Sequence, residues 1–349
     1  MTTIASAGIV TGHQLTVTDV IDETPDAKSI VLTVSDEVRD LFTYRPGQFL
    51  TFRIPSDETG HVARSYSLSS SPDTDVALKV TVKRTAGGYG SNWICDNLAP
   101  GSAVTVLPPS GRFTPTGFRH DLLLFAAGSG ITPVMSILKS ALTRTERSVV
   151  LFYANRDADS IIFRDELEGL ERRFADRLTV RHHLDDRHAV ATTDLLVELA
   201  SEHSSSEAFV CGPGPFMDLV GDALRTAGVP DERHHREVFL SLSGDPFGEV
   251  PAREVDPQSP TVETVVHLDD ETHRFDWPAD RTLVDVLLDR GVDVPFSCRS
   301  GECGSCACTV LSGAVDMANS EILDPADIAD GFILGCQSRP DSGPIEIEF

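Results

Sequence analysis

The feature that constrains this chain most is a group of cysteines near its C-terminal end. Cys298, Cys303 and Cys306 are separated by four and by two residues, and Cys336 follows thirty residues after Cys306. The residues between the first three cysteines are mostly glycine and serine, which let a backbone turn tightly. A short loop can bring three thiolates to one point, and a fourth must then arrive from a separate segment. This end of the chain is therefore predicted to fold around a compact set of sulfur ligands.

The spacing of these cysteines is that of plant-type [2Fe–2S] sites, in which four thiolates hold two irons. Structural zinc usually takes two pairs of closely spaced ligands, whereas only one Cys-x2-Cys pair occurs here. The chain has seven cysteines, and an odd number without a secretory signal argues against a disulfide framework. We therefore predict Cys298, Cys303, Cys306 and Cys336 as the metal ligands. Cys308 lies in an apolar run and is interpreted as a core residue.

The 349 residues are enough for two or three domains, and their pattern changes twice along the chain. The first 115 or so residues contain short β-rich runs separated by turns, which predicts a small barrel. Beyond His120, apolar strands alternate with helical stretches, which predicts a parallel sheet of βαβ units. A proline-rich stretch then precedes a region with a hairpin around Asp269-Asp270, a helix, a strand pair around Ser312-Gly313 and a last strand. The predicted boundaries are 1–116, 117–239, a linker at 240–260, and 261–349.

A first pair of motifs lies in the predicted barrel and suits a flavin. Arginine can pair with a phosphate, tyrosine offers a flat face, and serine can hydrogen-bond a ring nitrogen. The glycine-rich run that follows resembles a backbone nest around a pyrophosphate at a helix N-terminus. Either motif alone is also typical of an ordinary turn, but the two in this order favour a flavin site. The candidate residues are Arg64, Ser65, Tyr66, Ser67, Leu68, Val82, Lys83, Gly88, Tyr89, Gly90 and Ser91.

A second pair of motifs lies where strands of the predicted parallel sheet end, the place at which such sheets bind nucleotides. A Gly-x-Gly turn follows the first strand directly, with proline where the usual fingerprint has its last glycine. The candidate residues are Gly128, Gly130, Thr132, Pro133, Asn155, Arg156, Cys211, Gly212 and Pro213. Glu237 and Phe239 close this region; a carboxylate and an aromatic ring there could contact a flavin, although each alone is typical of ordinary structure.

The net charge of −25 is uneven, since the last 89 residues hold 18 Asp and Glu against five Arg. Nucleic acid is therefore an unsuitable partner, because phosphate binding needs clustered Lys and Arg. An acidic surface can steer a basic protein partner, or it can serve solubility alone. The longest apolar runs are far shorter than a membrane span, and the first ten residues do not form a signal peptide. A cytoplasmic protein that binds no membrane is expected.

Taken together, the motifs resemble the ferredoxin–NADP reductase superfamily over nearly the whole chain. The domain order is similar to that of reductase components of bacterial oxygenases, above all those of 3-ketosteroid 9α-hydroxylases. The resemblance implies an antiparallel β-barrel flavin domain, an α/β parallel-sheet nucleotide domain and a C-terminal α+β ferredoxin domain of the β-grasp type. The motifs that carry it are Arg64–Leu68, Thr81–Thr85, Tyr89–Cys95, Ala126–Pro133, Tyr153–Asp157, Cys211–Phe216 and Cys298–Cys308.

This resemblance implies a [2Fe–2S] cluster, FAD rather than FMN, and NADH rather than NADPH. It places Arg64, Tyr66 and Ser67 at the flavin, Ser91 at its phosphates, and Gly128 and Thr132 near the nicotinamide nucleotide. Ser67, Glu237 and Phe239 are the candidate catalytic residues, and a Rieske-type oxygenase is the expected electron acceptor. Phthalate-type reductases share the domain order with FMN, and reductases for phenylacetyl-CoA epoxidation share the architecture. The motifs also leave open a stand-alone NAD(P)H oxidase and a redox sensor.

The residues also bear on the choice of nicotinamide cofactor. A 2′-phosphate needs a concentrated positive site. After Tyr153 the chain offers one arginine, Arg156, beside two aspartates, Asp157 and Asp159. This charge balance favours NADH, which carries no 2′-phosphate.

Overall fold

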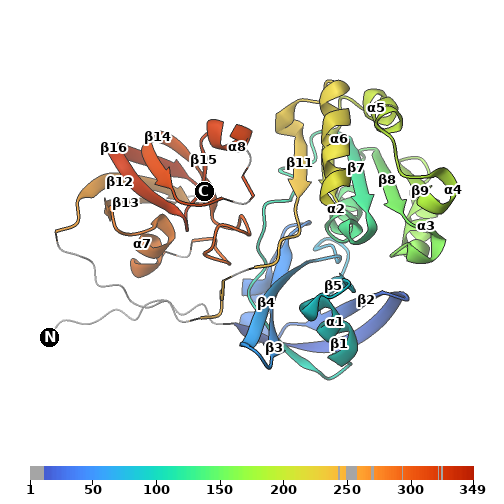
Figure 1. Ribbon diagram of the computed structural model, residues 1–349, viewed down its shortest axis with the longest axis horizontal. Helices are drawn as coiled ribbons and strands as arrows, with labels where there is room; N and C mark the ends of the chain where they lie inside the picture. Colours follow the sequence, from blue (N-terminus) through green and yellow to red (C-terminus); the bar gives the residue numbers. More distant parts are fainter. Residues whose placement is uncertain are drawn as a thin grey trace. The chain divides into compact units, whose positions relative to one another are not determined.

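The computed structural model describes residues 12–242, 244–248, 258–268, 271–292, 294–320, 322–323 and 325–349 (Figure 1). It contains two compact units, one formed by His13–Phe239 and one that includes Leu240–Phe349. The predicted turn at Asp269-Asp270, the predicted N-terminal segment Met1–Val10 and part of the predicted linker lie outside the described residues. Among the described residues, no helix combines the length and the apolar character needed to cross a membrane.

The first part of the larger unit is a six-stranded antiparallel sheet in the order β4-β3-β6-β1-β2-β5. A bridge between Leu68 and Val80 joins the ends of the two edge strands, so the sheet curls into the predicted barrel. Its interior is apolar and includes Leu15, Ile30 and Leu50, because alternate residues of each strand point inward. The elements are β1 (His13–Thr24), β2 (Ala27–Thr33), η1 (Asp36–Phe42), β3 (Phe49–Ser56), β4 (Gly60–Ser67), β5 (Leu78–Lys83), α1 (Tyr89–Asn97) and β6 (Ala103–Val106).

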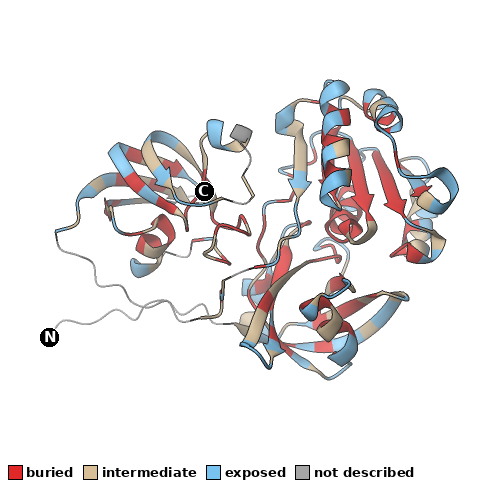
Figure 2. Cartoon of the chain, viewed as in Figure 1, coloured by how far each residue is buried: buried red, intermediate tan, exposed pale blue. Residues whose placement is uncertain are grey.

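The second part of this unit is the predicted parallel sheet, with the strand order β11-β10-β7-β8-β9. The strands β7 and β8 are buried along their whole length, which explains their continuous apolar sequence (Figure 2). The elements are β7 (Leu122–Ala127), η2 (Gly128–Gly130), α2 (Ile131–Arg144), β8 (Val149–Asn155), η3 (Ala158–Ser160), α3 (Arg164–Arg173), β9 (Leu178–Leu184), α4 (Asp185–His188), α5 (Thr193–Glu202), β10 (Glu207–Cys211), α6 (Gly214–Thr226), η4 (Asp231–Arg233) and β11 (His234–Glu237).

The C-terminal unit is a mixed sheet in the order β13-β12-β16-β14-β15, with a helix against its apolar face. The Thr282 hydroxyl caps that helix by accepting from the Asp285 N–H. The elements are β12 (Thr261–Leu268), β13 (Glu271–Pro278), α7 (Leu283–Asp289), β14 (Ala307–Met317), α8 (Pro325–Ala329), β15 (Phe332–Leu334) and β16 (Ser338–Glu348).

The prediction of a strand pair around Ser312-Gly313 is wrong. These residues lie inside the single strand β14, which pairs with β16 along most of its length. Gly313 has φ +89°, and the pairing register shifts on both sides of Ser312. Glycine at positive φ is a bulge signal as well as a turn signal, and here it marks a bulge.

Candidate functional site

The cysteine loop brings its three sulfurs together and aims backbone donors at them. The Ser300 and Glu302 N–H groups donate to Cys298 Sγ at 3.4 and 3.3 Å, and the Cys298 N–H donates to Cys303 Sγ at 3.3 Å. Gly301 and Gly304 have φ values of +82° and +72°, which bend the backbone around the sulfurs. Backbone donors of this kind stabilise negatively charged sulfur.

The fourth cysteine arrives from the segment between β15 and β16. The Cys298 thiol lies within hydrogen-bond reach of the Cys303 and Cys336 thiols, and Cys306 lies within reach of Cys336. These contacts lower the pKa of Cys298 well below its usual range, because a thiolate accepts hydrogen bonds from both neighbours. Four clustered sulfurs fit a [2Fe–2S] group. Cys308 is buried in the core of the unit, as its apolar run predicts.

The candidate flavin residues lie on and beside β4, and α1 begins next to them. A Cβ atom at Gly90 would lie 2.8 Å from Arg64 Cγ and 3.2 Å from the Tyr66 hydroxyl, so only glycine lets α1 approach this closely. Burial raises the pKa of Tyr66, which keeps its hydroxyl neutral. Ser67 and Leu68 are buried, and Ser65 shares a 3.0 Å hydrogen bond with Thr51. The arginine, the neutral tyrosine and the serines of this segment fit a flavin ring and a phosphate.

The glycine-rich run forms the start of α1, as predicted. Gly88 precedes the helix, and the Ser91 hydroxyl accepts from the Thr85 N–H at 3.1 Å. Tyr89 is half-exposed and donates to the Pro55 carbonyl at 2.6 Å. The N–H groups of the first turn of a helix lack intrahelical partners, so this end of α1 can receive a phosphate. Val82 differs from the other candidates, since its side chain lies in the barrel core.

The nucleotide turn, which we define as Gly128–Gly130, joins β7 to α2. A Cβ atom at Gly130 would lie 2.1 Å from the Cys211 carbonyl oxygen, so the turn packs directly against the end of β10. Thr132 and Pro133 are buried in the first turn of α2, and the Thr132 hydroxyl donates to the Ser129 carbonyl. The structure thus brings together the turns that begin at Gly128 and at Cys211, which lie more than eighty residues apart.

The carboxyl ends of the strands supply polar groups around this turn. The strand register aligns Glu237, Cys211, Ala126, Tyr153 and His182 in one row across the sheet. At the end of β8, Asn155 is 5% exposed and lies near the Tyr153 hydroxyl, but among the described residues neither end of its side-chain amide makes a hydrogen bond of ordinary geometry. A buried amide without partners is costly unless a ligand satisfies it. This edge of the sheet therefore fits a bound dinucleotide.

An acidic residue that the sequence did not reveal, Asp26, pairs beside the nucleotide turn with two predicted candidates, Lys83 and Arg156. Lys83 Nζ lies 3.9 Å from the position of a Cβ at Gly128, and it pairs with Asp26 at 3.6 Å. Arg156 pairs with the same carboxylate at 3.4 Å. Asp26 belongs to the β1–β2 turn, 130 residues before Arg156, so no spacing in the sequence pointed to it.

Glu237 and Phe239 end the larger unit. Glu237 is partly exposed, but protein atoms crowd its carboxyl group, and this burial raises its pKa to about 8. It lies beside Cys211 in the strand register. Phe239 is 48% exposed, so part of its ring surface is not covered by protein.

Three family models match this chain in the order of its parts. An oxidoreductase FAD-binding domain matches residues 14–114, an oxidoreductase NAD-binding domain matches 124–222, and a 2Fe-2S iron-sulfur cluster binding domain matches 266–341. The ferredoxin reductase component of 3-ketosteroid-9-alpha-monooxygenase from Rhodococcus rhodochrous is 58% identical over 337 residues, which are 96% of each chain. The chain belongs to the FNR-like reductases with FAD-binding, NAD-binding and 2Fe-2S domains.

More distant relatives of this reductase share its whole length. One of the subunits of 1,2-phenylacetyl-CoA epoxidase from Escherichia coli is 32% identical over 98% of each chain. The solved structure of phthalate dioxygenase reductase covers 97% of this chain and 98% of its own, at 26% identity and a TM-score of 0.59. The predicted fold class, the oxidoreductase activity and the FAD, NAD and [2Fe–2S] cofactors are confirmed.

Proposed function

We propose that this reductase takes electrons from NADH and delivers them to a Rieske-type oxygenase that hydroxylates a 3-ketosteroid. The observation that carries the proposal is the 58% identity, over 96% of both chains, to a reductase component named for that monooxygenase. The relative from phenylacetyl-CoA epoxidase is only 32% identical, which favours the steroid system over epoxidation. When bound, FAD accepts a hydride from NADH, and the [2Fe–2S] cluster carries single electrons onward.

The flavin-binding roles are assigned to residues that the barrel holds rigidly. Arg64 pairs with a flavin phosphate, Tyr66 contacts the ring, and Ser67 donates to a ring nitrogen. Ser91 and the N–H groups at the start of α1 bind the remaining phosphate. The supporting observation is the close approach at Gly90, which sets Arg64, Tyr66 and the helix start side by side.

The nucleotide-binding roles are assigned to the edge of the parallel sheet. The nucleotide turn and Thr132 contact the nicotinamide half, and the Asn155 amide, which makes no hydrogen bond of ordinary geometry with the described residues, hydrogen-bonds the nucleotide. The side of the nucleotide site that faces the nucleotide turn is formed by Cys211, Gly212 and Pro213. Phe239, whose side chain is 48% exposed, would contact the flavin ring. Glu237 holds a proton beside the reacting atoms.

The preference for NADH is assigned to the charges around Arg156. Asp26 already pairs with Arg156 and Lys83, and the Asp157 carboxylate lies one residue away, where it accepts from Ser160. A 2′-phosphate would have to compete with these carboxylates for the two cations. NADH, which lacks that phosphate, meets no such competition.

The acidic C-terminal unit is assigned to docking of the oxygenase, with Cys298, Cys303, Cys306 and Cys336 as cluster ligands. Opposite charges steer protein association, so the docking rate should fall as salt rises. The domain boundaries at residues 116, 239 and 260 and the cytoplasmic location stay predictions.

Reconstitution with candidate oxygenases tests the proposal. The purified reductase is mixed anaerobically with NADH and then, in air, with a 3-ketosteroid oxygenase or a phenylacetyl-CoA epoxidase and the matching substrate. We expect hydroxylated steroid only when the reductase, NADH and the ketosteroid oxygenase are all present, and at least tenfold less product with NADPH. Turnover with the epoxidase and none with the ketosteroid oxygenase would contradict the proposal.

A further inference from the structure

One face of α2 binds the barrel through hydrogen bonds and ion pairs of polar side chains at helical spacing. Ser136, Lys139 and Ser140 are three and four residues apart and so share a face. The Ser136 hydroxyl donates to the Ser70 carbonyl at 2.6 Å, and the Ser140 hydroxyl shares a 2.8 Å hydrogen bond with the Ser71 hydroxyl. All three side chains are buried. The loop that they touch directly continues the flavin segment Arg64–Leu68, while α2 directly continues the nucleotide turn.

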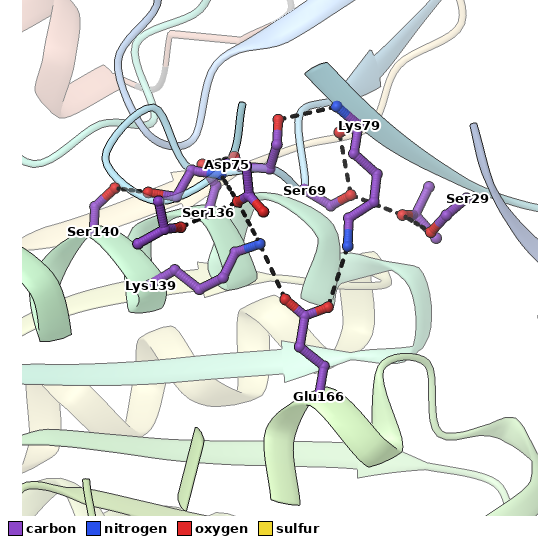
Figure 3. Close-up of polar contacts among 12 residues, drawn as sticks. Ser29, Ser69, Asp75, Lys79, Ser136, Lys139, Ser140 and Glu166 are labelled. Atoms are coloured by element: carbon purple, nitrogen blue, oxygen red, sulfur yellow. Dashed lines mark hydrogen bonds and ion pairs between the residues drawn. The ribbon is translucent and has the colours of Figure 1, made fainter. Parts of the chain in front are cut away.

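Ion pairs around two buried lysines reinforce this contact (Figure 3). Lys139 Nζ lies 2.7 Å from Asp75 Oδ2, in the loop before β5, and 3.1 Å from Glu166 Oε1, on α3. Glu166 Oε2 pairs in turn with Lys79 of β5 at 3.1 Å. The Lys139 and Lys79 side chains are only 5% and 14% exposed. The group holds two positive and two negative charges, so it is balanced, and it joins the barrel, α2 and α3.

A second chain of contacts leads from Lys79 back to the nucleotide turn. Lys79 Nζ lies 5.2 Å from the ring centre of Phe163, which precedes α3 with φ +61°, a conformation that a phenylalanine adopts only when its surroundings fix it. The adjacent Ile162 N–H donates to the Tyr153 hydroxyl, which donates to the Gly128 carbonyl at 3.1 Å. The charged group is therefore linked to the nucleotide turn through α2 and through Tyr153.

We propose that Lys139 is a positioning residue for hydride transfer: its ammonium, held between Asp75 and Glu166, fixes the nucleotide turn relative to the flavin segment. The inference rests on the roles proposed above for those two segments. Apolar side chains would pack α2 against the barrel without the desolvation that a buried ammonium costs, so we infer that these ion pairs serve geometry more than stability. Hydride transfer needs such a fixed geometry, since a displacement of about 1 Å can cost about 100-fold in rate.

The variant Lys139→Met removes the ammonium but leaves each carboxylate one remaining partner. Methionine is apolar and nearly as long as lysine. Asp75 Oδ2 still accepts a hydrogen bond from the Ser71 N–H at 2.7 Å, and Glu166 keeps its ion pair with Lys79. The fold should therefore survive while the geometry between α2 and the barrel loosens. Lys139→Arg restores the charge and the donors.

Arg144→Met is the matched control. Arg144 lies on the same helix and faces the same loop, with Nε 3.9 Å from Asp73 Oδ1, but its side chain is 54% exposed. An exposed ion pair at that distance is screened by water and therefore does little to fix the position of α2 relative to the loop.

The experiment is anaerobic stopped-flow reduction of the bound flavin by NADH in the full-length reductase. We expect Lys139→Met to lower the limiting reduction rate at least about tenfold, with the Kd for NADH within threefold and a weaker charge-transfer absorbance. Lys139→Arg should recover to within threefold of wild type, and Arg144→Met should match wild type. If Lys139→Met does not fold, the double variant Ser136→Ala/Ser140→Ala loosens the same contact without a charge change and should lower the same rate.

Two results would overturn the inference alone: a limiting rate in Lys139→Met within twofold of wild type, or an equal loss in Arg144→Met. A wild-type reductase that NADH does not reduce would instead overturn the proposed function, and this inference with it. The trace of the wild-type reductase therefore tells the two failures apart, because only failure of the proposed function leaves the wild-type flavin unreduced.

Discussion

The cysteine loop and the flavin–nucleotide region hold their cofactors in contrasting ways. Three of the predicted cluster ligands, and the backbone donors to Cys298 and Cys303, lie within Cys298–Cys306. Cys336 comes from elsewhere and donates its N–H to Cys306 Sγ at 3.4 Å. The flavin–nucleotide region instead draws on residues from Asp26 to Glu237 and depends on how α2 packs against the barrel. A locally built site should respond only to changes in its own loop, whereas an assembled site should respond to changes far from the reacting atoms. The following predictions test that difference, from the largest expected effect to the smallest.

Loss of one cluster ligand should separate the two regions most sharply. Cys303→Ser should remove iron and acid-labile sulfide and lower NADH-dependent reduction of cytochrome c at least about 100-fold, because one iron loses a thiolate. NADH-dependent reduction of ferricyanide, which needs only the flavin, should stay within about twofold of wild type. Iron analysis and the two assays in parallel measure both effects.

Cys308→Ala is the matched control, because Cys308 is buried in the same unit but is not a predicted ligand. It should keep its iron and both activities. A cluster that survives Cys303→Ser, or that is lost in Cys308→Ala, would contradict the ligand assignment.

The nucleotide turn should tolerate no added methyl group. In Gly130→Ala the new Cβ would lie 2.1 Å from the Cys211 carbonyl oxygen, so β10 or the turn must move. We expect the free energy of unfolding of the larger unit to fall by about 2 kcal/mol and the Kd for NADH to rise about tenfold or more. Denaturant unfolding and NADH titration measure the two quantities.

Gly169→Ala offers the comparison within the same part of the chain, because a Cβ there meets no atom within 4 Å. In the interior of α3 it should stabilise the protein by about 0.5–1 kcal/mol. An equally tolerated Gly130→Ala would show that the turn does not pack as described.

The raised pKa of Glu237 predicts a pH dependence confined to the assembled site. With a pKa of about 8, against an ordinary value near 4.5, the native carboxyl is mostly protonated at pH 7 and ionises as the pH rises through 8. The unfolded chain loses this proton at lower pH, so native stability falls between about pH 4.5 and 8 and then levels off. Glu237→Gln should remove this fall and should flatten the profile of flavin reduction between pH 7 and 9, where the wild type changes severalfold. A wild-type profile that is flat across this range would rule out the role of Glu237.

The smallest effect is expected at the start of α1. Ser91→Ala removes the hydroxyl that accepts a hydrogen bond from the Thr85 N–H. The free energy of unfolding should fall by about 1 kcal/mol. We expect the Kd for FAD to rise about fivefold and the iron content to stay unchanged. Flavin release measured by fluorescence checks this, and a drop in iron content would contradict the independence of the two regions.

The sequence alone determined the parts of this protein that depend on short spacing. The interval between Cys298 and Cys306 dictates that three sulfurs meet, whatever surrounds them, and the apolar run Leu122–Ala127 followed by Gly-x-Gly dictates a buried strand that ends in a nucleotide turn. Gly313 led to the wrong prediction of a strand pair, because a glycine at positive φ occurs in hairpin turns and in bulges alike. Only the pairing of β14 with β16 distinguishes the two.

Tertiary structure alone decided the contacts between residues that are distant in the chain. Asp26 meets Arg156 across 130 positions, and Lys139 meets Asp75 and Glu166. Of these five side chains, only Arg156 belongs to a motif in the sequence. The physical reason is that a charged side chain is ordinarily solvated, and nothing in its neighbours along the chain shows which distant side chain it will meet. For Lys139, burial and partners are fixed together, only when α2 and α3 pack against the barrel.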